Sequence, residues 1–306
     1  MAKETRVSSS TDQLRYPAEV RYREEIDALA ENDKDERPEN WRLSPRAVLT
    51  YILGGVSVEA RSAGKKKTVA ITPKFYGDRS IVERSIVTLA SERALLLLGD
   101  PGTGKSWLSE HLAAAISGNS TLTIQGTAGT TEEQIKYSWN IARVIAEGPT
   151  TGNLIPSPTM VAMRSGALLR FEEVTRCVPD VQDALVSILS DKAIAIPELP
   201  DANMTWARRG FNIIATANTR DQGVNDLSAA LKRRFNYIHI PMVQDANTEV
   251  QIVRQRSAEL LGSYGLPQEI PPKIADLITT VFREIRAGKS HEGVSLKQPS
   301  TTLSTA

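Results

Sequence analysis

Residues 94–106 decide the fold of this chain, and they read Ala94-Leu95-Leu96-Leu97-Leu98-Gly99-Asp100-Pro101-Gly102-Thr103-Gly104-Lys105-Ser106. An apolar run comes first, as in a buried strand, and the rest matches the Gly-x-x-x-x-Gly-Lys-Ser pattern of a phosphate-binding loop. The glycines let the backbone turn so that successive N–H groups point at phosphate oxygens. Lys105 adds a positive charge for the β- and γ-phosphates, and Ser106 offers a hydroxyl to Mg²⁺. After the loop the sequence predicts a helix, because several residues fall on one face at helical spacing: Trp107, Leu108, His111, Leu112 and Ala115.

The composition of the chain limits the classes of protein to which it can belong. The chain has 306 residues, of which 41% are hydrophobic and 24% charged, with a net charge of +1, so it has no general attraction for nucleic acid. Cys177 is the single cysteine and there are three histidines, which excludes internal disulfides, a Cys/His zinc site and a Cys/His protease. The sequence contains no run of 18 apolar residues and its first residues are polar, so we expect a cytoplasmic protein without a membrane span.

Three regions are expected along the chain: a polar helical extension at 1–70, an α/β nucleotide-binding domain at 71–242 and a helical lid at 243–306. The expected strands lie at 94–98, 121–125, 167–171, 211–217 and 236–241. The expected helices lie at 105–117, 180–190, 226–232, 246–262 and 271–287. Near-continuous apolar strands favour a central parallel sheet of five strands flanked by helices.

The extension contains two helical patterns. The first has a thin apolar stripe at Tyr22, Ile26 and Leu29. The second begins with Ser44 as N-cap and Pro45 at the first helical position, and it stops at Gly54-Gly55. We interpret it as a small docking element. For the run Lys65–Lys67 we favour a solvated linker over a contact with phosphates or acidic partners.

Two carboxylates follow the strand at 167–171. A Mg²⁺-dependent ATPase needs one carboxylate to hold the metal's water shell and a second to polarise the attacking water, so we assign Glu172 to the metal and Glu173 to the water. A later buried strand ends in Asn218, whose amide can orient that water. The alternatives are a solvated turn for the carboxylates and a capping role for Asn218.

Two arginines, Arg233 and Arg234, stand between the predicted helix at 226–232 and the last strand. An arginine stabilises the charge that develops on a transferring phosphoryl group, and a neighbouring subunit can supply it. Taken alone, such a cluster is more typical of a solvated helix end.

Taken together, these motifs resemble the AAA+ ATPases, and within them the MoxR-like branch. The resemblance covers residues 75–306 and rests on Phe75-Tyr76-Gly77-Asp78, the loop at 99–106, Phe171-Glu172-Glu173-Val174, Ala215-Thr216-Ala217-Asn218 and Arg233-Arg234-Phe235. It implies that ATP and Mg²⁺ are the cofactors. Phe75, Tyr76 and Gly77 would line the adenine pocket, and the phosphate loop and Trp107 would hold the nucleotide. Asn218 would be sensor 1. Arg234 would be the arginine finger of the next subunit's site, with Arg233 as the alternative.

Two further segments look like insertions of this clade, which face the ring pore and engage the client. One is the interval 126–163, in which Tyr137 and Trp139 are the aromatic residues of interest. Aromatic packing is the interpretation we favour for both of them. The other is 195–209, which looks like a hairpin before sensor 1.

Two departures from the family pattern stand out. Glu172 replaces the usual Asp, which predicts retained but slower hydrolysis. The chain stops at residues 301–306, where Ser304 resembles an N-cap and the family's sensor 2 arginine is expected. Either Ala306 replaces that arginine or the sequence is a fragment of a longer protein.

The resemblance implies a hexameric homo-oligomeric ring that hydrolyses ATP to remodel or activate a protein client, and it implies a partner with a von Willebrand A domain. A nucleic-acid motor is one alternative, but it needs a basic pore, and the insert offers Lys136, Arg143 and, at its edge, Arg164. A non-hydrolysing ATP-binding switch, arrested by Glu172 and the incomplete lid, is the other.

Overall fold

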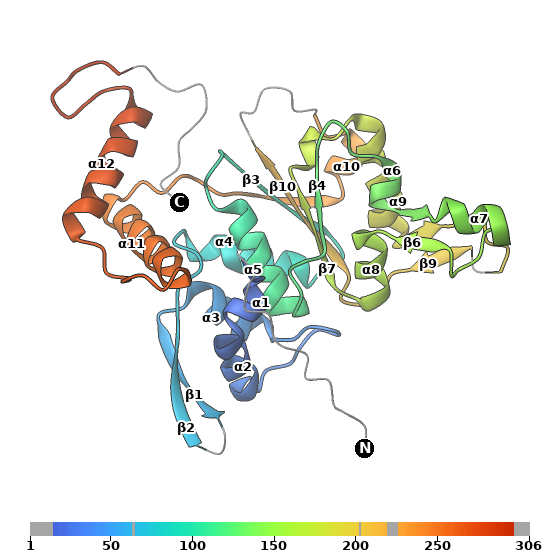
Figure 1. Cartoon of the computed structure of the whole chain (residues 1–306), viewed down its shortest axis with the longest axis horizontal. Helices are drawn as coiled ribbons and strands as arrows, with labels where there is room; N and C mark the ends of the chain where they lie inside the picture. Colours follow the sequence, from blue (N-terminus) through green and yellow to red (C-terminus); the bar gives the residue numbers. More distant parts are fainter. Residues whose placement is uncertain (1–14, 63–64, 202, 219–225, 297–306) are drawn as a thin grey trace.

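The computed structural model describes residues 15–62, 65–201, 203–218 and 226–296. Its centre is a five-stranded sheet in the order β11-β3-β10-β7-β4, and every neighbouring pair is parallel (Figure 1). The strands are β3 (Ala94–Gly99), β4 (Thr123–Gln125), β7 (Leu168–Glu172), β10 (Asn212–Asn218) and β11 (Phe235–His239). The predicted parallel sheet is confirmed, and each strand overlaps its predicted range.

Alternate residues of β3 face opposite sides of this sheet. Leu95 and Leu97 belong to one hydrophobic cluster with α4 (Arg79–Leu89) and α5 (Lys105–Ser117). Ala94 and Leu96 belong to a second cluster with α8 (Pro158–Ser165) and α9 (Pro179–Asp191). Both faces of β3 are therefore buried, which explains why its sequence is continuously apolar.

The N-terminal segment packs onto α5. It comprises α1 (Ala18–Arg21), α2 (Arg23–Asn32), α3 (Pro45–Leu53) and an antiparallel hairpin of β1 (Val56–Ser62) and β2 (Lys65–Ile71). The predicted cap of α3 is confirmed, because the Ser44 side chain accepts a hydrogen bond from the Ala47 N–H at 3.2 Å. The linker assigned to Lys65–Lys67 is wrong: these residues lie in β2, where pairing with β1 satisfies their backbone. Ile26, Leu43 and Tyr51 are fully buried in the same cluster as α5.

The region between β4 and β7 contains α6 (Glu132–Ile135), β5 (Tyr137–Trp139), α7 (Ile141–Glu147), β6 (Leu154–Pro156) and α8. After β7 come the short 3₁₀ turn η1 (Val174–Arg176) and α9, then the hairpin of β8 (Ala193–Ala195) and β9 (Met204–Trp206). The hairpin predicted at 195–209 is confirmed. Helix α10 (Ala229–Lys232) precedes β11. In Figure 1, α7 forms one end of the molecule.

The opposite end is formed by α11 (Ala246–Ser263) and α12 (Pro272–Ala287), which confirm both predicted lid helices (Figure 1). Ser304 and Ala306, which bear on the sensor 2 expectation, lie outside the described residues. None of the helices in the described ranges has the length and apolar character needed to cross a membrane.

Candidate functional site

The phosphate loop joins the end of β3 to the start of α5. Gly102 and Gly104 have φ values of 78° and 86°, in the left-handed region that favours glycine. A Cβ on Gly99 would lie 2.5 Å from the carbonyl oxygen of Ile240, so the loop also needs glycine for a close backbone approach. The ammonium group of Lys105 donates to the carbonyl oxygens of Gly99 at 3.0 Å and Asp100 at 2.7 Å. The loop has the shape and charge of a phosphate cradle.

A cavity of about 490 Å³ opens beside this loop, within the size range of small-molecule sites. Most of the predicted site residues line it: Tyr76, Gly77, Pro101, Gly102, Thr103, Gly104, Lys105, Ser106, Trp107, Glu173 and Asn218. Three other predicted site residues lie close in the chain to lining residues without lining the cavity themselves: Gly99, Asp100 and Glu172. The structure therefore brings the residues predicted for the adenine pocket, the phosphate loop and the sheet edge around one cavity.

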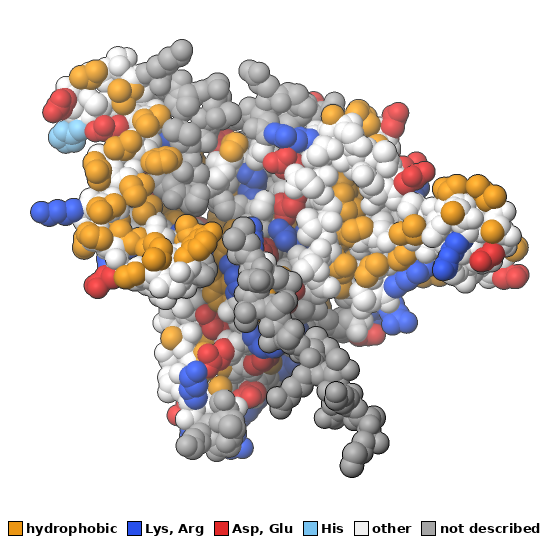
Figure 2. Space-filling model, in the orientation of Figure 1, with side chains coloured by type: hydrophobic (Ala, Val, Ile, Leu, Met, Phe, Trp, Pro, Cys, Tyr) orange, Lys and Arg blue, Asp and Glu red, His pale blue; other side chains and the backbone are white. Residues whose placement is uncertain are grey.

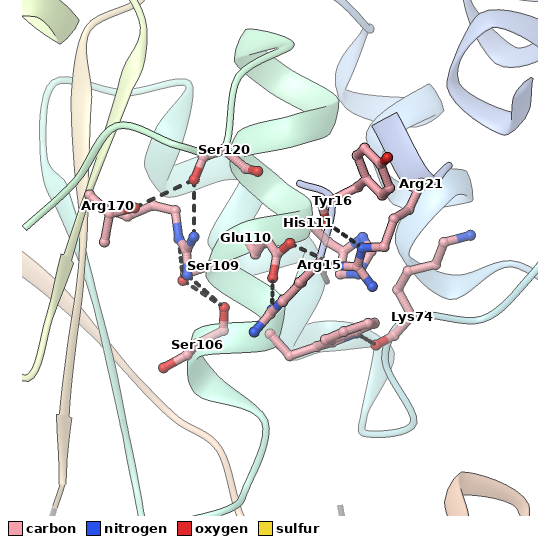
Figure 3. A network of polar contacts seen from close by, with 12 residues as sticks. Arg15, Tyr16, Arg21, Lys74, Ser106, Ser109, Glu110, His111, Ser120 and Arg170 are labelled. Carbon is pink, nitrogen blue, oxygen red and sulfur yellow. Dashed lines mark hydrogen bonds and ion pairs between the residues drawn. The ribbon is translucent and has the colours of Figure 1, made fainter. Parts of the chain in front are cut away.

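Glu172, at the end of β7, is buried and held by hydroxyl groups. One carboxylate oxygen accepts from Ser106 at 2.6 Å and Thr216 at 2.8 Å, and the other accepts from Ser109 at 2.6 Å. Arg170 forms an ion pair with Glu172 at 2.8 Å. Figure 3 shows Arg170 beside Ser106 and Ser109 of α5. Burial raises the pKa of Glu172, but Arg170 and the three hydroxyls outweigh it and leave this pKa below its ordinary value.

These oxygen atoms fit a magnesium ion. Mg²⁺ prefers hard oxygen ligands, keeps several waters and needs only one or two protein groups when a nucleotide supplies phosphate oxygens. The Ser106 hydroxyl and the ionised Glu172 carboxylate are such groups, and they already lie within hydrogen-bond distance of each other. The longer Glu side chain is accommodated because Ser109 and Arg170 bind its second oxygen.

Glu173 has an unusual backbone. Its φ of 55° and ψ of 47° are left-handed, which is uncommon for a residue with a Cβ and stores strain at functional sites. Its N–H donates to Thr216 at 3.0 Å, and its carboxylate pairs with Arg176 at 2.9 Å. A Cβ on Gly126 would lie 2.3 Å from the Glu173 carbonyl oxygen, so glycine is required at that neighbouring position.

Asn218 lies next to the start of the phosphate loop. It is the last residue of β10 and pairs in register with Gly99 of β3. Since parallel strands carry their carboxyl ends to one edge, the end of β10 and the phosphate loop meet there. The structure thus places Asn218 beside the phosphate loop, and its role as sensor 1 stays a prediction.

Arg233 and Arg234 are not brought to this cavity. The Arg234 guanidinium donates to the Ser190 hydroxyl and the Ala230 carbonyl oxygen, both at 2.5 Å, and Arg233 donates to Ala229 at 3.3 Å. Both arginines precede β11, whereas the phosphate loop follows the carboxyl end of β3, and these two strands are parallel. A role for either arginine in phosphate chemistry therefore requires the site of another subunit.

The lid supplies cavity residues that sequence reasoning missed. The Arg256 guanidinium lies 3.1 Å from the Trp107 ring centroid, and Arg286 pairs with Glu249 at 2.5 Å; all four residues line the cavity or its edge. The Tyr76 hydroxyl donates to the side chain of Gln255 on α11. Helical periodicity gave no signal for these contacts, because Arg256 and Arg286 reach the site from separate helices.

Arg170 and Thr216 were also missed, although a signal existed. Each lies two residues before a predicted site residue, Glu172 and Asn218, so strand alternation places it on the same face. The aromatic residues of the insert pack on a common partner: Tyr137 and Trp139 donate to the two carboxylate oxygens of Glu198 at 2.9 and 3.4 Å. The most exposed large hydrophobic side chains of the insert are instead Ile141 and Ile145 of α7.

Comparisons with known proteins agree with this geometry. The model of the AAA domain (dynein-related subfamily) matches residues 94–235, and that of the YehL-like AAA+ ATPase C-terminal domain matches residues 247–306. The protein YehL of Escherichia coli (strain K12) is 46% identical over 293 residues, covering 95% of this chain and 78% of YehL. YojN of Bacillus subtilis (strain 168) is 26% identical over 55% of this chain and 54% of its own length.

A structure of the complex between subunits BchI and BchD of magnesium chelatase aligns with a TM-score of 0.44 and 18% identity, covering 70% of this chain and 80% of that chain. The assignment of the family rests on the two family models and on YehL. This chain belongs to the MoxR-like AAA+ ATPases, in the group that contains YehL.

Proposed function

We propose that this protein binds and hydrolyses Mg-ATP at the subunit interfaces of a hexameric ring and uses the energy to remodel or activate a protein client. The observation that supports it most strongly is the convergence of Lys105, Ser106, Glu173 and Asn218 on one cavity, with Glu172 hydrogen-bonded to Ser106 behind it. When bound, Mg²⁺ supplies charge neutralisation of the phosphates. Family membership supports the ring and the protein client.

In this proposal each side chain has a separate task. The loop N–H groups and Lys105 hold the phosphates, while Ser106 and Glu172 hold the metal and its waters. The carboxylate of Glu173 accepts a proton from the attacking water, and the amide of Asn218 orients that water. Arg234 of a neighbouring subunit stabilises the charge on the transferring phosphoryl group, with Arg233 as the alternative.

A complementation experiment tests the interface. Glu173→Gln removes the base but keeps the finger, whereas Arg234→Ala removes the finger but keeps the base. Each variant alone should be inactive. An equal mixture forms some interfaces that combine an intact site with an intact finger, so about a quarter of the wild-type rate should return. A mixture as inactive as its components would contradict a finger acting in trans.

The surface of the insert supports a protein client. Ile141 and Ile145 of α7 are 64% and 82% exposed. Helix α7 lies at the end of the molecule opposite α11 and α12 (Figure 1), and Figure 2 shows hydrophobic side chains on the surface of that end. The charges of the insert argue against a pore that binds nucleic acid. Its basic residue Lys136 is paired with Glu132, and two further acidic residues, Glu133 and Glu147, would repel phosphates. We propose a cytoplasmic client partner with a von Willebrand A domain, by extension from the family.

A pull-down of the client tests the proposal that a protein client binds at α7. Glu173→Gln protein loaded with ATP should retain a von Willebrand A domain protein in a pull-down, and the same protein with Ile145→Asp should lose it. Val87 of α4, which is 70% exposed on another face, gives the matched control Val87→Asp. Equal retention by all three variants would place the client contact elsewhere than α7.

A further inference from the structure

A cluster of charged and aromatic side chains joins the N-terminal segment to the helix behind the phosphate loop. Its centre is Glu110 of α5, which is buried. One of its carboxylate oxygens accepts from Arg15 at 2.6 Å and the other from Arg21 at 2.7 Å. Figure 3 shows Glu110 between the two guanidinium groups. One negative charge faces two positive charges, so the cluster keeps a net charge of +1.

The two arginines differ in their surroundings. Arg21 is enclosed: it donates to the Tyr16 carbonyl oxygen and lies over the rings of Tyr22 and Trp107. Arg15 has a side chain that is 68% exposed, and it lines the nucleotide cavity. Within the described part of the chain, Glu110 is the hydrogen-bond partner of its guanidinium.

Helix geometry places Arg15 relative to the loop. Glu110 is four residues after Ser106, so both lie on the same side of α5, one turn apart. Arg15 is thereby held beside the start of α5, and it lines the cavity together with Ser106 and Trp107. Glu173 and Asn218 line the same cavity from the sheet edge.

We propose that Arg15 is a further nucleotide-binding residue, which contacts a phosphate oxygen of the bound nucleotide and is held in place by Glu110. This inference rests on the proposed ATP site. A guanidinium offers several N–H donors in one plane, so it can bind Glu110 and a phosphate together. Arg15 also lies outside residues 94–235 and 247–306, which the family models match. The N-terminal segment would then complete the nucleotide site.

The test compares nucleotide affinity among three arginine variants. Arg15→Ala should weaken ATP binding by about tenfold, because one charge-assisted hydrogen bond is lost. Arg15→Lys should recover part of that loss. Raising the salt concentration should shrink the difference, because the contact is exposed. Arg23→Ala is the matched control, because Arg23 is an exposed arginine of the same segment that lies outside the cavity lining.

Two results are decisive. Wild-type affinity in Arg15→Ala, together with lost affinity in Lys105→Ala, would overturn the role of Arg15 and leave the ATP site standing. Absence of ATP binding by the folded wild-type protein would overturn both. Thermal unfolding of Arg15→Ala close to wild type is expected, since Arg21 continues to neutralise Glu110.

Discussion

The hydroxyl of Ser106 lies 2.6 Å from a carboxylate oxygen of Glu172, although 66 residues separate them in the sequence. This contact joins the first turn of α5 to the end of β7, the two elements that share the magnesium ion in the proposed site. The second oxygen of Glu172 is bound by Ser109 and Arg170. A glutamate can therefore serve where the family usually has an aspartate, because the extra length is anchored.

Removing the charge of Glu172 should weaken the binding of magnesium at this site. In Glu172→Gln we expect the Mg²⁺ concentration for half-maximal hydrolysis to rise at least tenfold, and the free energy of unfolding to fall by about 1–3 kcal/mol as Arg170 loses its partner. Titration of Mg²⁺ at saturating ATP measures the first effect. An unchanged requirement would remove Glu172 from the metal site.

Lys105→Ala should abolish the phosphate contact without unfolding the loop, because glycines and not Lys105 set the backbone path. Loss of a charge-assisted contact of roughly 2–3 kcal/mol corresponds to about a hundredfold weaker ATP binding. Lys66→Ala in β2, an exposed lysine far from the cavity, is the control and should bind normally. Equal affinities would show that ATP binds elsewhere.

Gly126→Ala should displace Glu173, since the new Cβ would lie 2.3 Å from the Glu173 carbonyl oxygen. We expect a destabilisation of about 1–3 kcal/mol and a larger fractional loss of hydrolysis than of ATP binding. At Gly129, the nearest atom to a Cβ is the Thr127 hydroxyl at 3.9 Å, so Gly129→Ala should be mild. Equal thermal stability of both variants would contradict the close approach.

The buried His111 should make the stability of the fold depend on pH. Burial, and then the charges of Arg21, Lys74, Arg256 and Arg170, hold its pKa well below the ordinary value of 6.5. In the unfolded chain the imidazole takes up a proton below about 6.5 that the folded protein resists. Stability should therefore fall with decreasing pH below 6.5, by up to about 1.4 kcal/mol per pH unit. Urea unfolding of wild type and His111→Gln between pH 5 and 8 measures it, and the variant should lose that slope.

The sequence predicted those parts of the molecule whose structure depends on residues that are neighbours in the chain. The five strands follow from apolar runs buried on both faces, and the phosphate loop follows from its own glycines. The hairpin of β1 and β2 was missed because Lys65–Lys67 dominate its composition, while the buried residues of its described part are Val69 and Ile71 at the end of β2. The contacts of Arg15, Arg170 and Arg256 were missed because their partners lie on other helices or strands. A local sequence pattern does not predict contacts between residues that are far apart in the chain.

Steady-state phosphate release tests the central claim most directly. Wild-type protein assembled with ATP and Mg²⁺ should release phosphate continuously, and chelation of Mg²⁺ should stop it. Glu173→Gln should bind ATP with wild-type affinity and release almost none. Wild-type protein that binds ATP but releases no more phosphate than Glu173→Gln would contradict hydrolysis and favour an ATP-binding switch.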